Sequence, residues 1–79
     1  MKNNDTTAAL IIIGAEVLSG KVQDENGPFL IQQLRKKGVD VKEVRIIDDD
    51  SEAIIHAVTH LSKKHTFVFT TGGIGPTHD

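Results

Sequence analysis

The chain has 79 residues, a formal net charge of −2, three aromatic residues, all Phe, and no cysteine. A chain of this length forms one small domain at most. With no basic stripe and few side chains for base stacking, the sequence argues against nucleic-acid binding. The lack of cysteine excludes disulfides and thiolate metal sites.

The amino-terminal residues carry no targeting signal. Residues 1–7 are polar and are expected to form a flexible leader. The apolar run that follows, Ala8 to Ile13, has six residues, too few for a signal-peptide core or a transmembrane helix. We therefore expect a cytoplasmic protein with no membrane partner.

The first strand and the first helix are predicted from the amino-terminal half. Residues 8–13 are unbroken and apolar, which indicates a strand buried on both faces. Residues 14–25 are polar and predict a loop. Asn26 then has the chemistry of a helix N-cap, and Gly27 and Pro28 suit the first helical turn.

This helix is expected to continue to about Lys37, where basic residues favour its negative end and Gly38 suits a left-handed closing residue. Three apolar side chains are expected to face inward: Phe29, Leu30 and Leu34. A second strand is predicted at 41–47, although its apolar alternation slips between Val41 and Val44.

A second helix follows the acidic run at 48–50. Asp49 and Glu52 have the spacing of a capping box, and Lys63 and Lys64 close the helix. Its inward stripe is predicted to consist of Ile54, Val58 and Leu61. Residues 66–70 form the third predicted strand.

The order strand, helix, strand, helix, strand indicates two βαβ units and an α/β fold with a parallel sheet. The apolar first strand favours the central position, so we expect the order 2-1-3 with the helices on opposite faces. In that order the loops after the first and third strands lie side by side, at the sheet edge where open α/β folds bind ligands.

The second of these loops, residues 70–79, has the composition of a phosphate-binding turn. Gly72, Gly73 and Gly75 would let backbone amides approach an anion, and Pro76 suits the start of a following helix. It matches neither a Walker loop nor the dinucleotide fingerprint. The alternative is a tight structural turn after a strand.

Three carboxylates are candidates for binding Mg²⁺ or orienting water, namely Glu16, Asp24 and Asp79. Taken singly, Asp24 also fits a cap for the first helix and Glu16 a solvated side chain. Asn26 is similarly open between cap and ligand. His56 and His60 are expected on a solvent-exposed helix face and lack the sequence signature of a metal site. His65 matches no functional motif, and only His78 lies in the candidate phosphate-binding loop.

The segments IIIGAEVLSGKVQDEN and FVFTTGGIGPTHD resemble the molybdopterin-binding (MoaB/Mog-like) domain. Within it they are most similar to the competence/damage-inducible protein A (CinA) branch and to the amino-terminal domain of eukaryotic FAD synthases. The resemblance begins near Ala8, and residues 8–79 would form the amino-terminal half of the domain. Ala15 departs from the pattern, because the family usually has Asp or Asn there.

The resemblance implies a three-layer α/β/α fold, a homo-oligomer, and a small phosphorylated ligand, either a nucleotide or a pterin. It assigns phosphate binding to the loop and to Asn26, and catalysis or metal binding to the carboxylates. The ligand-binding set would be Thr71, Gly72, Gly73, Gly75, Thr77 and Asn26. The catalytic set would be Asp79, Glu16 and Asp24, of which Asp79 and Glu16 would bind a divalent metal such as Mg²⁺.

Three functions follow as expectations from the resemblance. The first is metal-dependent hydrolysis of a nucleotide pyrophosphate, ADP-ribose or FAD-like, by the full-length protein, with the 79 residues alone inactive. The second is molybdopterin binding or adenylyl transfer in molybdenum cofactor biosynthesis. The third is a non-catalytic ligand-binding or regulatory module.

Overall fold

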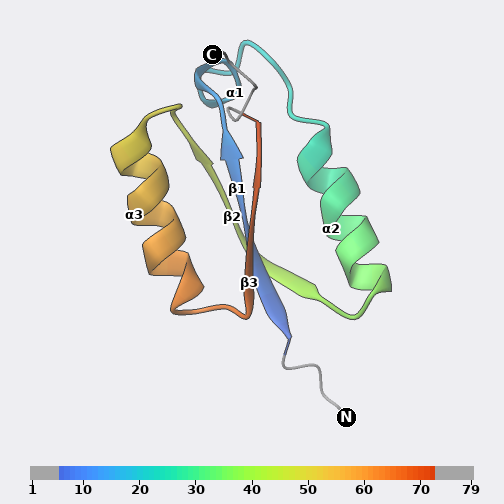
Figure 1. Cartoon of the computed structure of the whole chain (residues 1–79). Coiled ribbons are helices and arrows are strands. Elements are labelled where there is room, and N and C mark those ends of the chain that lie inside the picture. The colour runs from blue at the N-terminus through green and yellow to red at the C-terminus, as the bar shows by residue number, and fades with distance from the viewer. Residues whose placement is uncertain (1–5, 73–79) are drawn as a thin grey trace.

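The structure, a computed structural model, describes residues 6–72 as one three-stranded sheet with three helices. The strands are parallel and lie in the order β2-β1-β3, as predicted. Figure 1 shows the two long helices flanking the sheet, and the short helix beyond the end of β1. In chain order the elements are β1 (Thr7–Ile13), α1 (Ala15–Leu18), α2 (Asn26–Lys36), β2 (Asp40–Ile47), α3 (Ser51–Ser62) and β3 (Phe67–Thr71).

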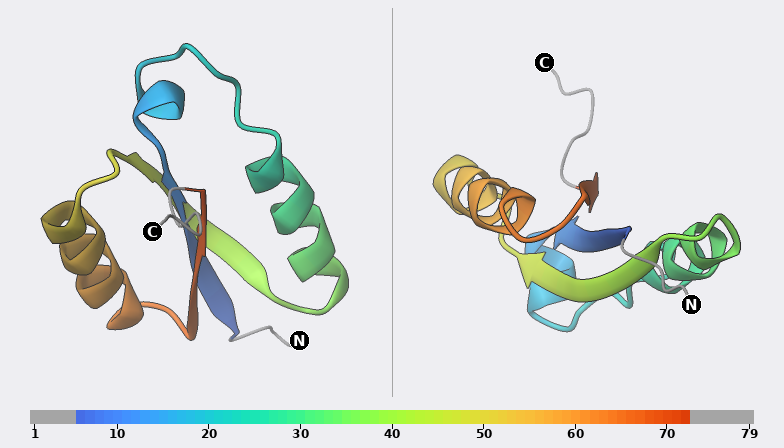
Figure 2. Two further views of the ribbon diagram at one scale, coloured as in Figure 1. Left: turned by 45° about the horizontal axis from the view of Figure 1, so that its top comes forward. Right: turned by 90° about the horizontal axis from the view of Figure 1, so that it is seen from below.

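The long helices cover opposite faces of the sheet, which gives the predicted α/β/α layering (Figure 2). On one face, alternate residues of β1 pack with Ala57 and Leu61 of α3 to form the buried core. On the other face, the Ile12 side chain lies against α2, because a Cβ added to Gly27 would come 3.2 Å from Ile12 Cδ1. Successive β1 side chains point to opposite faces, so an apolar central strand serves both layers.

A register shift in β2 explains the broken alternation of its sequence. Ala8 pairs with Val41 and Ala9 pairs with Glu43, so Lys42 is an extra residue in the strand. Beyond this point the alternation is regular, with half-buried and exposed residues taking turns to Ile47. The extra residue places the apolar residues before and after it on the same face of the sheet, which their spacing in the sequence alone would not do.

The caps expected at Asn26 and Asp49 were wrong, whereas the alternative that Asp24 caps the first helix is confirmed. In α2 the cap is supplied by Asp24, whose carboxylate accepts hydrogen bonds from the backbone N–H groups of Asn26 (3.2 Å) and Gly27 (2.9 Å). In α3 the cap is Asp50, which accepts from the Ala53 N–H at 2.9 Å, one residue after the predicted position. Asp50 has the extended backbone of an N-cap (φ −138°, ψ 127°), and the path of the entering chain decides which neighbouring carboxylate caps.

Two details of the predicted loop and first helix also differ. The segment predicted as loop contains the single turn α1. Phe29 was expected to face inward but is 61% exposed, whereas Leu30 and Leu34 are half-buried. These two leucines and the half-buried Ile31 form the inner stripe of α2, and Phe29 is turned toward solvent.

The remaining helix signals are confirmed. Gly38 follows α2 with a left-handed backbone (φ 85°), and Leu61 is buried with Ile54 and Val58 packed beside it. None of the helices described within residues 6–72 combines the length and apolar composition that a membrane crossing requires.

Candidate functional site

A hollow of about 420 Å³ lies at the carboxyl ends of β1 and β3. One wall comes from the segment after β1, including Val22, Asp24 and Asn26, and the other comes from Thr71 and Gly72 at the end of β3. Figure 1 shows α1 and the connection to α2 arching over this end of the sheet. The described start of the second loop, Thr71 and Gly72, therefore lies beside the segment after β1, as the strand order predicted, and the rest of that loop lies outside the described residues.

Local backbone bonds fold the segment after β1 back toward the sheet. The Gly14 N–H donates to the Ile47 carbonyl at 2.9 Å, which fixes where β1 ends against β2. The Glu16 carbonyl then accepts from the N–H groups of Lys21 (2.9 Å) and Val22 (3.1 Å). Gly20 makes the reversal with φ 85°, a conformation that other residues adopt at a cost. The result is a wall with an apolar part at Val22 and a polar part beyond it.

Asp24 is one of the two carboxylates that line the hollow, the other being Glu25, and it has a structural role as well. Its two oxygens accept from the backbone N–H groups of Asn26 and Gly27, and its side chain is only partly exposed. A side chain at position 27 would collide with the Asp24 carboxylate, which explains the buried glycine there. Each Asp24 oxygen keeps a second acceptor position, so capping and contact with a ligand are compatible.

Gly72 is held against the end of β1. Its φ of 74° is left-handed, and an added Cβ would lie 2.5 Å from the Ile13 carbonyl oxygen. Only glycine allows this approach without a backbone shift. The preceding residue, Thr71, pairs with Ile12 and brings its side chain to the hollow.

The other predicted site residues are placed differently. Glu16 is exposed on α1 and lines a separate shallow hollow with Ser19 and Lys21. Asn26 lines the main hollow, and its backbone N–H is engaged by Asp24. Four predicted residues lie outside the described residues: Gly73, Gly75, Thr77 and Asp79. The structure thus brings together Asp24, Asn26, Thr71 and Gly72.

Among residues 6–72 there is no group of three or more His, Cys, Asp or Glu side chains able to hold a metal ion. His56 and His60 are exposed on α3, and their rings stack with centroids 6.3 Å apart. The described part of the main hollow offers two carboxylates, Asp24 and Glu25, to a cation.

Sequence reasoning missed His65. Its side chain is only 7% exposed, and its ring lies 2.7 Å from Glu43 Oε1 and 3.1 Å from Thr7 Oγ1. Glu43 could have pointed to this histidine, because Glu43 is one of the half-buried residues of β2 and a half-buried carboxylate needs a polar partner.

The fold is that of an open parallel α/β protein, and its hollow lies at the carboxyl ends of the strands, the edge at which proteins of this class bind ligands. The chain belongs to the family described as "Probable molybdopterin binding domain", which matches residues 9–79. It is 41% identical over 73 residues to a "Probable FAD synthase" of Caenorhabditis briggsae, covering 92% of this chain and 14% of that protein.

Two solved structures share the fold. CinA from Thermoplasma acidophilum, described as having unknown function, superposes with a TM-score of 0.86 at 29% identity and covers 95% of this chain. The tungsten cofactor synthesizing protein MoaB from Pyrococcus furiosus gives 0.81 at 26% identity and covers 98%. The present chain spans 44% and 48% of these two structures respectively, and a smaller share of the FAD synthase. The predicted family and its CinA and MoaB likeness are confirmed.

Proposed function

We propose that the main hollow binds the phosphate of a nucleotide-like ligand, and that the whole protein hydrolyses a nucleotide pyrophosphate such as ADP-ribose or FAD with a divalent metal. The observation that carries the proposal is that Thr71 and Gly72 share one hollow with Asp24 and Asn26. Asp24 and Asn26 lie at the end of the first segment that carries the family resemblance, and Thr71 and Gly72 lie within the second.

The described residues offer complementary groups to a phosphorylated ligand. The Thr71 hydroxyl can donate to a phosphate oxygen, and the bare backbone at Gly72 lets a ligand approach closely. The proposal extends the phosphate contacts to Gly73, Gly75 and Thr77, which lie outside the described residues.

A carboxylate beside a phosphate is the oxygen donor that Mg²⁺ requires, and Asp24 fits this role with its remaining acceptor positions. Asp79 and Glu16 are proposed as further metal ligands. Glu16 would have to reach from the neighbouring hollow, so the proposal depends more on Asp24 than on Glu16. When bound, Mg²⁺ would polarise the phosphate and activate water.

The likeness to MoaB, a tungsten cofactor synthesizing protein, favours a second candidate. In that case the same hollow would bind a phosphorylated pterin such as molybdopterin, with adenylyl transfer as the reaction. The apolar wall at Val17 and Val22 would contact a flat ring equally well from a nucleotide or a pterin. Binding of ADP-ribose against molybdopterin separates the two candidates.

Calorimetric titration with ADP-ribose, with and without Mg²⁺, tests the phosphate site. Thr71→Val removes the hydroxyl but keeps a β-branched residue in β3, so we expect at least tenfold weaker binding, equivalent to about 1.4 kcal/mol. Thr70→Val is the matched control, because Thr70 is exposed and does not line the hollow. Equal affinity of Thr71→Val and the parent would refute the proposed phosphate contact.

Two variants at helix caps test the contribution of the Asp24 charge to Mg²⁺-dependent binding. Asp24→Asn removes the charge and, with its single acceptor oxygen, keeps one of the two capping bonds, so we expect the Mg²⁺-dependent part of the affinity to fall with a modest loss of stability. Asp50→Asn makes the same change at the cap of α3 and should leave binding unchanged. If both variants respond to Mg²⁺ as the parent does, Asp24 is only a cap.

A further inference from the structure

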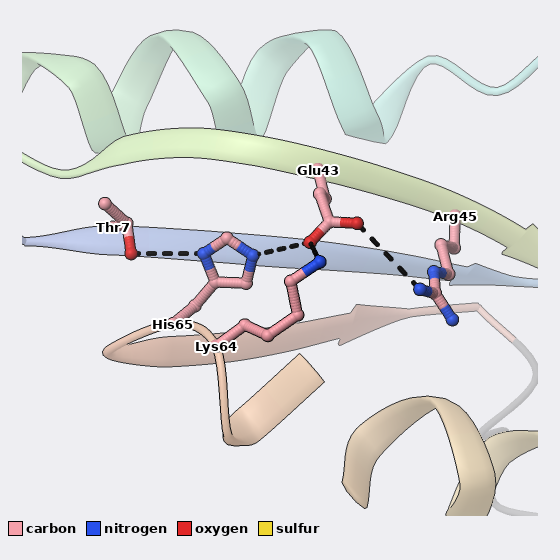
Figure 3. Close-up of polar contacts among 5 residues, drawn as sticks. All are labelled: Thr7, Glu43, Arg45, Lys64 and His65. Atoms are coloured by element: carbon pink, nitrogen blue, oxygen red, sulfur yellow. Dashed lines mark hydrogen bonds and ion pairs between the residues drawn. The ribbon is translucent and has the colours of Figure 1, made fainter. Parts of the chain in front are cut away.

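A second polar cluster lies at the opposite end of the sheet from the hollow. His65, in the connection between α3 and β3, places Nδ1 3.1 Å from Thr7 Oγ1 and Nε2 2.7 Å from Glu43 Oε1 (Figure 3). Thr7 begins β1 and Glu43 lies in β2. One nearly buried imidazole therefore joins the two other strands to the start of β3.

Glu43 is the charged centre of this cluster. Its Oε1 also lies 3.1 Å from Lys64 Nζ, and its Oε2 lies 3.9 Å from the Arg45 guanidinium. The hydrogen bonds from His65 and Lys64 lower the pKa of Glu43 from its ordinary 4.5 to about 2. The carboxylate is thus ionised at neutral pH and available to accept the bond from His65.

The imidazole can make both contacts in either protonation state. The neutral ring donates through Nε2 to Glu43 and accepts from the Thr7 hydroxyl at Nδ1, and the charged ring donates at both atoms. A further bond supports the same junction, from the Thr7 N–H to Thr66 Oγ1 at 3.4 Å. The cluster therefore ties the chain immediately before β3 to the first residue of β1.

The packing of β3 gives limited support to its register, because Val68 packs against the core but the adjacent Phe69, on the other face, is also half-buried. Within the described sheet β3 is an edge strand paired with β1, and its burial sequence includes an exposed Phe67 (44%). A slip of one residue on β1 would reverse the face of every β3 side chain. It would also move Thr71 away from Ile12 and out of the hollow.

We propose that His65 is a positioning residue that sets the register of β3 on β1 and thereby places Thr71 and Gly72 in the hollow. The polar cluster fixes the start of β3. Because all five residues of β3 pair with β1 in one register, the position of the start also sets the position of Thr71 at the end. The register itself is independent of any ligand; only its consequence for binding rests on the function proposed above.

Nuclear magnetic resonance of the ligand-free protein tests this directly. In His65→Ala we expect the amide signals of Thr71 and Gly72 to shift, the cross-strand contact between Thr71 and Ile12 to weaken, and β3 amides to exchange with solvent at least tenfold faster. His65→Gln should restore much of the parent behaviour, because its amide offers a donor and an acceptor side by side. His60→Ala is the matched control, since it removes an exposed histidine from the neighbouring helix.

The outcomes are distinct. Unchanged Thr71 and Gly72 signals in a folded His65→Ala would overturn the proposal, as would a His65→Gln variant that behaves like His65→Ala. If His65→Ala does not fold, Thr7→Ala removes one of the two contacts and should still accelerate exchange in β3. A displaced β3 in a protein whose parent form does not bind ADP-ribose would support the register role while refuting the proposed function.

Discussion

Replacing Gly72 with alanine should destabilise the protein more than the same change at another left-handed glycine. Gly72 has φ 74°, and an alanine Cβ would lie 2.5 Å from the Ile13 carbonyl oxygen. Gly38 has a similar φ of 85°, but an added Cβ meets nothing within 4 Å. The two glycines therefore share a conformational cost and differ in a steric one.

The expected magnitudes follow from this difference. A left-handed backbone costs a residue with a Cβ about 1–2 kcal/mol, so Gly38→Ala should lower the free energy of unfolding by about that amount. At Gly72 the obstacle is backbone and cannot rotate away, which adds about 1–3 kcal/mol as in other overpacked sites. Gly72→Ala should thus cost about 2–5 kcal/mol, a large fraction of the stability of a small domain.

Urea unfolding followed by far-ultraviolet circular dichroism measures both variants, because the chain has no Trp or Tyr for fluorescence. The difference between them isolates the contact with Ile13. If Gly72→Ala is no less stable than Gly38→Ala, β3 does not end against the Ile13 carbonyl and the described wall of the hollow is wrong.

Two further predictions concern the core and the polar cluster. Leu61→Ala removes a fully buried side chain and should lower the free energy of unfolding by about 2–5 kcal/mol in the same urea assay. Its control is Ile55→Ala, at a position 63% exposed on the same helix, which should cost less than about 0.5 kcal/mol. Similar losses for the two variants would contradict the described orientation of α3. Because the pKa of Glu43 is lowered to about 2, its stabilising contribution is complete above pH 4.5 and is lost as the pH falls from 4.5 towards 2. The urea midpoint of Glu43→Gln should therefore fall less steeply than that of the parent over this range, and parallel curves would show that Glu43 is not held in its charged form.

The elements and their order could be predicted from the sequence because their signals are local. An unbroken apolar run from Ala8 marks a strand buried on both faces, and Gly38 closes a helix whatever surrounds it. Two βαβ units with an apolar first strand then leave few arrangements of a small parallel sheet. The same order brings the segment after β1 beside the end of β3, so the position of the hollow also followed from the sequence.

The strands, their parallel order and the end of the sheet that carries the hollow could thus be inferred from the sequence, since apolar periodicity and chain connectivity encode them. The contacts in three dimensions were needed to show that Asp24 rather than Asn26 caps α2, that Glu16 lies apart from it, and that His65 joins Thr7 to Glu43. These contacts depend on distances between segments remote in the chain and on the direction in which each segment enters its helix or strand. The extra residue in β2 shows the same limit, because a register exists only between two strands, and neither strand's sequence contains it alone.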